Sequence, residues 1–107
     1  MLSLSMIVRD EAAQIEDCLR SVQGFVDEMV VVDTGSTDNT VALAQAMGAR
    51  VERIDWPGDF APARNQALQW VSGDWVLVLD ADERLRPEAM APLRARMAQP
   101  DLSLIHI

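Results

Sequence analysis

The sequence predicts an α/β fold, built on a mostly parallel open sheet of about four strands with helices on both faces. Short apolar runs alternate along the chain with segments whose apolar residues recur at helical spacing. The run at residues 75–79 is too short to span a membrane, but it suits a central strand that is covered on both faces. Alternation of this kind is typical of parallel strands joined by helices.

The expected strands are short, apolar and bounded by turn-forming residues, and they lie at residues 3–8, 29–32, 50–54 and 75–79. The intervening segments carry apolar residues three or four positions apart, which is typical of helices that pack on a sheet. Helices are therefore expected at residues 11–24, after the polar segment 33–40 as far as 47, at 63–71, and from 87 onward. Pro57 and Gly58 predict a loop before the third helix.

Size, charge and cysteine content narrow the class of protein. The 107 residues suit one domain, and a net charge of -8 argues against a nucleic-acid partner and against adhesion to anionic lipid, because both need a basic face. Cys18 is the single cysteine, so it forms no intramolecular disulfide and is expected to be a small core residue. The first residues lack a basic region and a long apolar segment, so we expect a cytoplasmic chain without a signal peptide or transmembrane segment.

Acidic residues follow the expected strands: Asp10, Asp33, and the pair Asp80 and Asp82. The carboxyl ends of parallel strands meet at one edge of the sheet, which is where open α/β sheets bind ligands. In extended chain, the side chains of Asp80 and Asp82 would share one face, about 6.6 Å apart at roughly 3.3 Å of rise per residue. Such a pair could hold Mg²⁺ or Mn²⁺ together with substrate phosphates, and a cation would relieve the repulsion between the acids.

Individual residues at this edge leave alternatives open. Asp33 could accept a hydrogen bond from a base imide or a ribose hydroxyl, or could serve only its loop. Arg64 could supply positive charge to a diphosphate, or could be a solvated surface residue. Ser36, Thr37 and Asp38 are expected to cap the following helix. The three tryptophans are expected to be core or loop anchors: Trp56, Trp70 and Trp75.

Four blocks of sequence together resemble the amino-terminal half of a family 2 glycosyltransferase, in order as well as in spacing. They are residues 5–11, 31–40, 59–65 and 78–83, and the resemblance covers about residues 3–98. The branch that the chain resembles contains bacterial enzymes similar to lipopolysaccharide-core β-glucosyltransferases.

This resemblance implies a GT-A fold, whose Rossmann-like amino-terminal half binds a nucleotide-sugar, with the strands in the order 3-2-1-4. It also implies a UDP-sugar donor and a Mn²⁺ or Mg²⁺ cofactor. The implied nucleotide contacts are the backbone around Val8 and Arg9, the side chains of Asp33 and Arg64, and Asp80; the implied metal ligands are Asp82 and Asp80.

The implied reaction is an inverting transfer of the sugar to a hydroxyl of a saccharide or lipid-linked acceptor, with the full-length protein associating peripherally with a membrane. Asp10, Glu11 and Glu83 do not match the family's base position, so no catalytic residue is assigned and the chain alone is expected to be inactive. Two other classes stay open: a noncatalytic nucleotide- or metal-binding α/β domain, and a receiver-like signalling domain. A receiver would need a fifth strand followed by Lys, and the chain contains no Lys.

Residues 102–107 continue none of these patterns and read as the translation of a transposon-end sequencing adapter. We therefore expect a donor-binding half domain at residues 1–101 and a non-native tail at 102–107; the alternative is a natural edge strand. Without a native neighbour, the strand at 75–79 would expose an apolar edge that invites pairing between chains. Sequencing of the source locus tests the origin of the tail.

Overall fold

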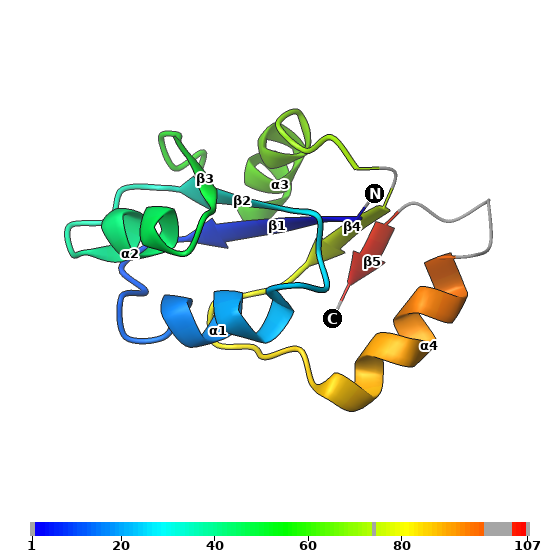
Figure 1. Cartoon of the computed structure of the whole chain (residues 1–107). Coiled ribbons are helices and arrows are strands. Elements are labelled where there is room, and N and C mark those ends of the chain that lie inside the picture. The colour runs from blue at the N-terminus through cyan, green and yellow to red at the C-terminus, as the bar shows by residue number, and fades with distance from the viewer. Residues whose placement is uncertain (1, 74, 98–103, 107) are drawn as a thin grey trace.

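The computed structural model describes residues 2–73, 75–97 and 104–106. Within these ranges the chain forms a parallel sheet of five strands in the order β3-β2-β1-β4-β5 (Figure 1). The strands are β1 (Leu2–Val8), β2 (Glu28–Asp33), β3 (Arg50–Arg53), β4 (Trp75–Val78) and β5 (Leu104–His106). The predicted α/β fold and the 3-2-1-4 order of the first four strands are confirmed.

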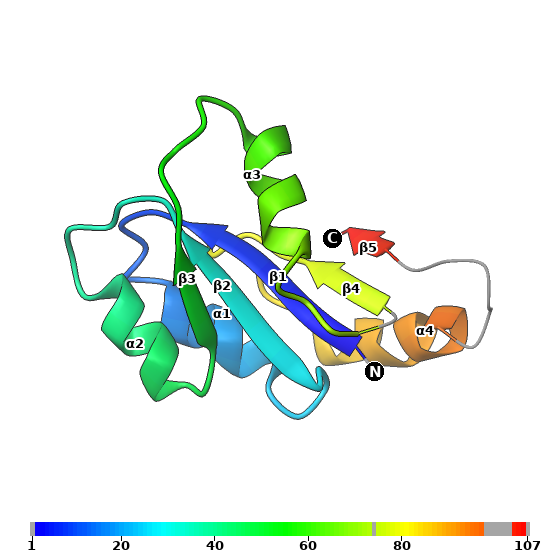
Figure 2. The same ribbon diagram turned by 90° about the horizontal axis from the view of Figure 1, so that it is seen from above.

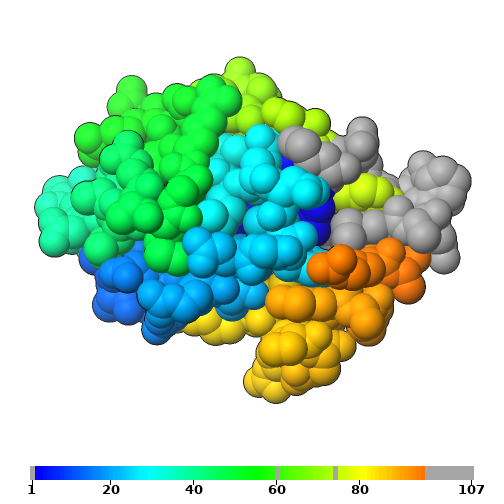
Figure 3. Space-filling view, viewed as in Figure 1, coloured from blue at the N-terminus to red at the C-terminus, as the bar shows by residue number. Residues whose placement is uncertain are grey.

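Helices cover both faces of the sheet, as predicted. Helices α1 (Ile15–Val22), α2 (Thr40–Ala46) and α4 (Pro87–Met97) pack on one face, and α3 (Phe60–Leu68) packs on the other. Figure 2, seen from above, shows α3 over the middle of the sheet. In the space-filling view of Figure 3, α1 (blue) and α4 (orange) lie in the lower part of the molecule. The guanidinium of Arg94 in α4 lies over the ring of Phe25, 4.9 Å from its centroid.

The central strand β1 divides its side chains between two apolar layers, because alternate residues of a strand point to opposite faces. Leu4 and Met6 are fully buried against α1 and β4, in the larger layer. Ile7 points to the other face and packs with Val32 and Ala67 beneath α3. The position of β1 at the centre of the strand order places its carboxyl end, at Val8, in the middle of the edge at which open α/β sheets bind ligands.

Two helices have boundaries that differ from the predicted ones. Helix α1 begins at Ile15 rather than at residue 11, because residues 11–14 form a turn in which the carbonyl of Glu11 accepts the amides of Gln14 and Ile15. Helix α3 begins at Phe60, three residues before the predicted start, and ends at Leu68. Pro62 allows the earlier start, because an amide in the first turn of a helix has no partner within that helix.

The expectation of an unpaired β4 edge was wrong. Strand β5 pairs in parallel with β4, with Val76 opposite Leu104 and Val78 opposite His106. The physical reason is that a short segment able to form a strand gains backbone hydrogen bonds at a sheet edge whatever its origin. The pairing does not test that origin, and the non-native tail stays a prediction.

Cys18 is fully buried in the larger layer, which confirms its predicted role as a core residue. Its thiol donates a 3.4 Å hydrogen bond to the carbonyl of Asp80, and burial raises the pKa of the thiol from 9.0 to about 12. Because the unfolded chain loses this proton first, the thiol's contribution to stability is present below pH 9 and falls as the pH rises toward 12.

We therefore expect iodoacetamide to alkylate Cys18 very slowly in the folded chain at pH 8 and rapidly in urea, because the thiolate is the nucleophile and burial withholds it. Mass spectrometry of samples quenched at increasing urea concentrations measures this, and the unfolding curve from fluorescence should follow the same transition. Rapid alkylation without urea would contradict the burial of Cys18.

Candidate functional site

Two adjoining hollows lie at the carboxyl edge of the sheet. The first hollow has a volume of about 360 Å³ and the second about 300 Å³. They share two wall residues, Ile7 and Glu11, so together they form one cleft over the end of β1, called here the edge cleft. The other residues of the first hollow are Val8, Arg9, Thr34 and Trp56, and those of the second are Gln14, Arg64, Asp80 and Asp82.

The edge cleft brings together five of the six site residues that the sequence predicted. Val8 and Arg9 line the first hollow, whereas Arg64, Asp80 and Asp82 line the second. These residues come from the ends of β1 and β4 and from α3, so the parallel topology collects them from distant parts of the sequence. Both hollows carry charges of both signs: Arg9 and Glu11 line the first, and the second places the guanidinium of Arg64 and the carboxylates of Glu11, Asp80 and Asp82 around the same space.

The acids after β4 are set by a turn, not by extended chain. The strand ends at Val78, and the amide of Asp80 donates to the Glu83 carboxylate at 2.9 Å while the amide of Glu83 returns a 2.9 Å bond to the Asp80 carbonyl. The expected extended geometry of Asp80 and Asp82 is therefore wrong, because Glu83 closes the turn. Both side chains are nevertheless exposed and line the second hollow.

The donor set of the second hollow fits a divalent metal only in part. Within the ranges that the structure describes, no three His, Cys, Asp or Glu side chains lie close enough to hold a metal ion together. Asp80 and Asp82 nevertheless offer exposed carboxylate oxygens, and Mg²⁺ is commonly bound by one or two carboxylates plus substrate phosphates. A metal at this position would therefore depend on oxygen ligands from the substrate.

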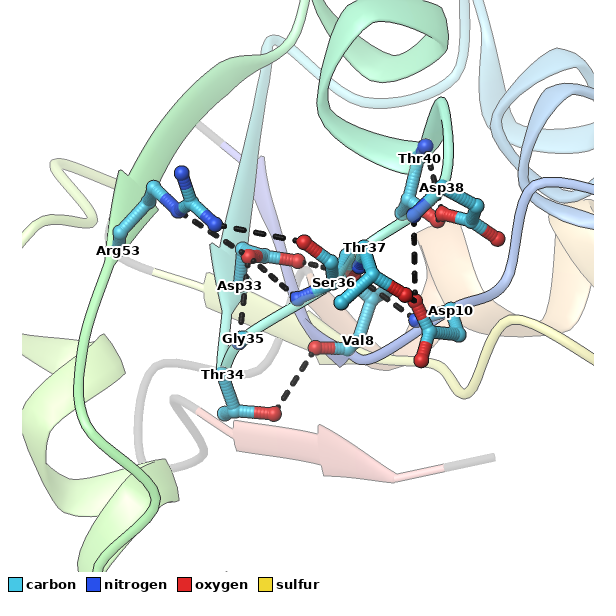
Figure 4. A network of polar contacts seen from close by, with 10 residues as sticks. All are labelled: Val8, Asp10, Asp33, Thr34, Gly35, Ser36, Thr37, Asp38, Thr40 and Arg53. Atoms are coloured by element: carbon cyan, nitrogen blue, oxygen red, sulfur yellow. Dashed lines mark hydrogen bonds and ion pairs between the residues drawn. The ribbon is translucent and has the colours of Figure 1, made fainter.

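Asp33 lies outside both hollows. Its side chain is fully buried and organises the loop that follows β2 (Figure 4). One carboxylate oxygen accepts the amides of Gly35 and Ser36, at 3.2 and 3.1 Å, and pairs with the guanidinium of Arg53 at 3.3 Å. The other oxygen accepts the hydroxyl of Ser36. A direct contact between Asp33 and a nucleoside stays a prediction, and the present geometry gives the carboxylate a role in the loop.

Of the three residues predicted to cap helix α2, Asp38 binds the start of that helix. The helix begins at Thr40, and the side chain of the preceding Asn39 makes no capping hydrogen bond. Asp38 accepts the amide of Thr40 at 2.9 Å and also its hydroxyl. These bonds lower the pKa of Asp38, the hydroxyl of Thr40 having the larger effect. The hydroxyl of Ser36 instead donates to Asp33, and the amide of Thr37 donates to the carboxylate of Asp10.

Sequence reasoning missed several wall residues of the edge cleft: Ile7, Glu11, Gln14, Thr34 and Trp56. Ile7 and Thr34 directly flank the last residues of β1 and β2, a signal that could have identified them, whereas Glu11 and Gln14 lie in the segment between β1 and α1 and carry no such signal. Trp56 is different, because it was expected to be a core or loop anchor. The loop between β3 and α3 instead carries its side chain, which is 39% exposed, to the first hollow.

Comparison with protein families decides the class of the chain. The family described as glycosyl transferase family 2 matches residues 3–106. The chain belongs to this family. The four sequence blocks that resembled it therefore reflect membership, and the receiver-like alternative is excluded.

Two curated relatives match most of this chain, and one of them is named a glycosyltransferase. A TPR repeat-containing protein of Synechococcus elongatus is 53% identical over 100 residues, which cover 94% of this chain and 25% of that protein. An uncharacterized glycosyltransferase of Rickettsia felis is 41% identical over 87 residues, which cover 81% of this chain and 30% of that protein. The chain thus spans less than a third of the length of these relatives.

A solved structure of similar fold contains ligands. The glucosyl-3-phosphoglycerate synthase of Mycobacterium tuberculosis, in complex with Mn²⁺ and UDP-glucose, superposes with a TM-score of 0.77 at 28% identity over 94% of this chain and 40% of that one. This likeness supports the GT-A fold. No helix within the described residues of the present chain is long and apolar enough to cross a membrane.

Proposed function

We propose that this chain is the donor-binding part of a glycosyltransferase that binds a UDP-sugar with Mn²⁺ or Mg²⁺ and supports inverting transfer of the sugar to an acceptor hydroxyl. The observation that carries the proposal is the edge cleft, in which a hollow that contains the indole of Trp56 adjoins a hollow lined by Arg64, Asp80 and Asp82. A nucleoside diphosphate has the same division, with a flat base at one end and charged oxygens at the other.

In this proposal the first hollow receives the nucleoside. Val8 and Arg9 provide backbone at the end of β1, and the indole of Trp56 offers a flat apolar wall against which a base can stack. Stacking of a base on an aromatic side chain is worth about 1–3 kcal/mol. Asp33 contributes at this end by ordering the loop from which Thr34 reaches the hollow, and its direct contact with uracil or ribose stays part of the proposal to be tested.

The second hollow receives the diphosphate and the sugar. The guanidinium of Arg64 attracts phosphate oxygens and fixes their orientation, since a planar fork of donors matches phosphate geometry. Asp80 lies toward the ribose or sugar, and Asp82 is the principal metal ligand. When bound, the metal would neutralise the charge that develops on the leaving diphosphate.

The acceptor, a saccharide or a lipid-linked hydroxyl compound, and the catalytic base belong to the remainder of the longer relatives in this proposal. We assign a cytoplasmic location because nucleotide-sugar chemistry suits it. Peripheral membrane association is proposed only for the full-length protein, because the net charge of -8 argues against adhesion of this chain itself to anionic lipid. The 107-residue chain alone is expected to show no sugar transfer above background, since general-base catalysis is typically worth about 10² to 10⁴ in rate and an oriented acceptor contributes further.

Calorimetric titration with UDP tests the proposal. The chain should bind UDP weakly, and Mn²⁺ should strengthen the binding. The Arg64→Ala variant should lose about 1.5–3 kcal/mol of UDP binding, which is typical of hydrogen bonds to charged groups, while its affinity for uridine stays close to that of the unmodified chain. Arg86→Ala provides a matched control, because Arg86 is exposed and lies outside the edge cleft.

Absence of UDP binding with and without Mn²⁺ would contradict the proposal. If this chain binds UDP tightly but its full-length relatives transfer no sugar, the noncatalytic nucleotide-binding alternative would be favoured.

A further inference from the structure

Asp10 adopts an unusual backbone conformation at the mouth of the edge cleft. Among the described residues it is the one non-glycine residue with a positive φ, +52°. Asp and Asn tolerate this left-handed region better than most residues, but it still costs conformational energy that other contacts must offset. A residue held in this conformation between Arg9 and Glu11, which both line the first hollow, points to a local function.

The side chain of Asp10 binds the loop that follows β2 (Figure 4). One carboxylate oxygen accepts the amide of Thr37 at 2.6 Å, its hydroxyl at 3.3 Å and the amide of Asp38 at 3.4 Å. The backbone amide of Asp10 donates in return to the hydroxyl of Ser36 at 2.8 Å. Because the acceptor is charged, the Thr37 bond belongs to the stronger class of hydrogen bonds.

The next two amides continue the same attachment. The amide of Glu11 donates to the hydroxyl of Thr40 at 2.9 Å, and the amide of Ala12 donates to the carboxylate of Asp38 at 3.2 Å. Three successive amides after β1 therefore end on side chains of residues 36–40. We call this set of bonds the loop clasp.

The loop clasp has no part in the apolar core. Asp10 is exposed and lines neither hollow, so its carboxylate would touch no ligand in the edge cleft. Its two sequence neighbours, however, form walls of that cleft. The clasp therefore holds the backbone of Arg9 and Glu11 in position through hydrogen bonds and not through apolar packing.

We propose that Asp10 is a positioning residue of the donor site: by clasping the loop after β2, it holds the backbone of Arg9 and Glu11 in the conformation that receives the nucleotide. This inference rests on the proposed function. It assigns to the acid after β1 a role that is neither metal binding nor base catalysis. The effect is reciprocal: if the clasp strengthens nucleotide binding by a given free energy, the bound nucleotide stabilises the clasp by the same free energy.

Two substitutions separate the effect of the backbone conformation of Asp10 from the effect of its side-chain acceptor. Asp10→Gly accepts the positive φ but removes the acceptor, whereas Asp10→Asn tolerates the same φ and keeps an oxygen for the amide of Thr37. We expect Asp10→Gly to weaken UDP binding about tenfold and Asp10→Asn to restore it to within about threefold, since the first loses the charge-assisted hydrogen bonds from Thr37 and Asp38 and the second keeps a neutral acceptor for them.

Calorimetry gives the affinities, thermal unfolding gives the stability, and NMR gives the chemical shift of the Thr37 amide proton. The Thr37 shift should move upfield in Asp10→Gly and return in Asp10→Asn, in step with affinity. Where Asp10→Gly does not fold, the unmodified chain decides: saturating UDP should slow hydrogen exchange of the Thr37 and Glu11 amides.

The outcomes are distinct. Equal UDP affinity of a folded Asp10→Gly variant and the unmodified chain overturns the role of Asp10 and leaves the proposed function standing, as does unchanged amide exchange on addition of UDP. An unmodified chain that binds no UDP overturns the proposed function, and this inference with it.

Discussion

The Asp82→Asn variant is expected to lose the metal-dependent increment of UDP binding, while its affinity for UDP without metal stays close to that of the unmodified chain. The change removes one anionic ligand but keeps the size of the side chain. The expected loss of Mn²⁺ affinity is at least about tenfold, because mutation of a residue that only hydrogen-bonds to a metal ligand already lowers metal affinity by about that factor. Among the described residues, no third His, Cys, Asp or Glu groups with Asp80 and Asp82 closely enough to hold a metal ion, so no other such side chain is placed to replace the lost carboxylate.

Titration of UDP at fixed Mn²⁺, repeated with EDTA, measures the increment for each variant. Glu83→Gln is the matched control: it also removes one negative charge from the same turn, but its side-chain oxygen can still accept the amide of Asp80. We expect this control to keep the increment. Loss of the increment in Glu83→Gln together with its retention in Asp82→Asn would mean that the metal ligands have been assigned to the wrong acids.

The contrast between Asp82 and Glu83 marks the limit of what the sequence could predict here. An apolar run that ends in acids correctly placed Asp80 and Asp82 at the carboxyl edge, because strand burial and parallel topology are both visible in the pattern of residues. The pattern did not reveal that Glu83 would bind the Asp80 amide and close a turn. Side-chain bonds to nearby backbone compete with extended structure and leave no periodic signal.

Trp56 and β5 were missed for a related reason. The segment 55–60 was correctly predicted to be irregular, but the direction in which such a loop carries its side chains depends on what the loop packs against. The pairing of β5 with β4 likewise depends on an available edge and on the three paired positions Leu104–His106, fewer than a periodic pattern requires. Tertiary contacts decided both features.

The Asp33→Ala variant is expected to lower the free energy of unfolding by about 2–4 kcal/mol, because it removes the charged acceptor of three partly buried hydrogen bonds, from the amides of Gly35 and Ser36 and from the hydroxyl of Ser36. The pair with Arg53 adds little, since the Arg53 side chain is 64% exposed. Urea unfolding measures the loss. A change below about 0.5 kcal/mol, the range of ordinary surface substitutions, would show that the loop does not depend on this carboxylate.

Asp33→Asn then separates the two roles that remain open for this residue. The amide can place its oxygen toward Gly35 and Ser36 and its NH₂ toward the hydroxyl of Ser36, which accepts as well as donates, so the loop should keep its shape at a cost of about 1 kcal/mol. Because the native side chain is fully buried, we expect Asp33→Asn to bind uridine within about threefold of the unmodified chain, whereas Asp33→Ala binds it more weakly. A fall of about tenfold or more in a stably folded Asp33→Asn variant would instead mean that the carboxylate leaves its loop partners and contacts the nucleoside directly, as the family resemblance implied.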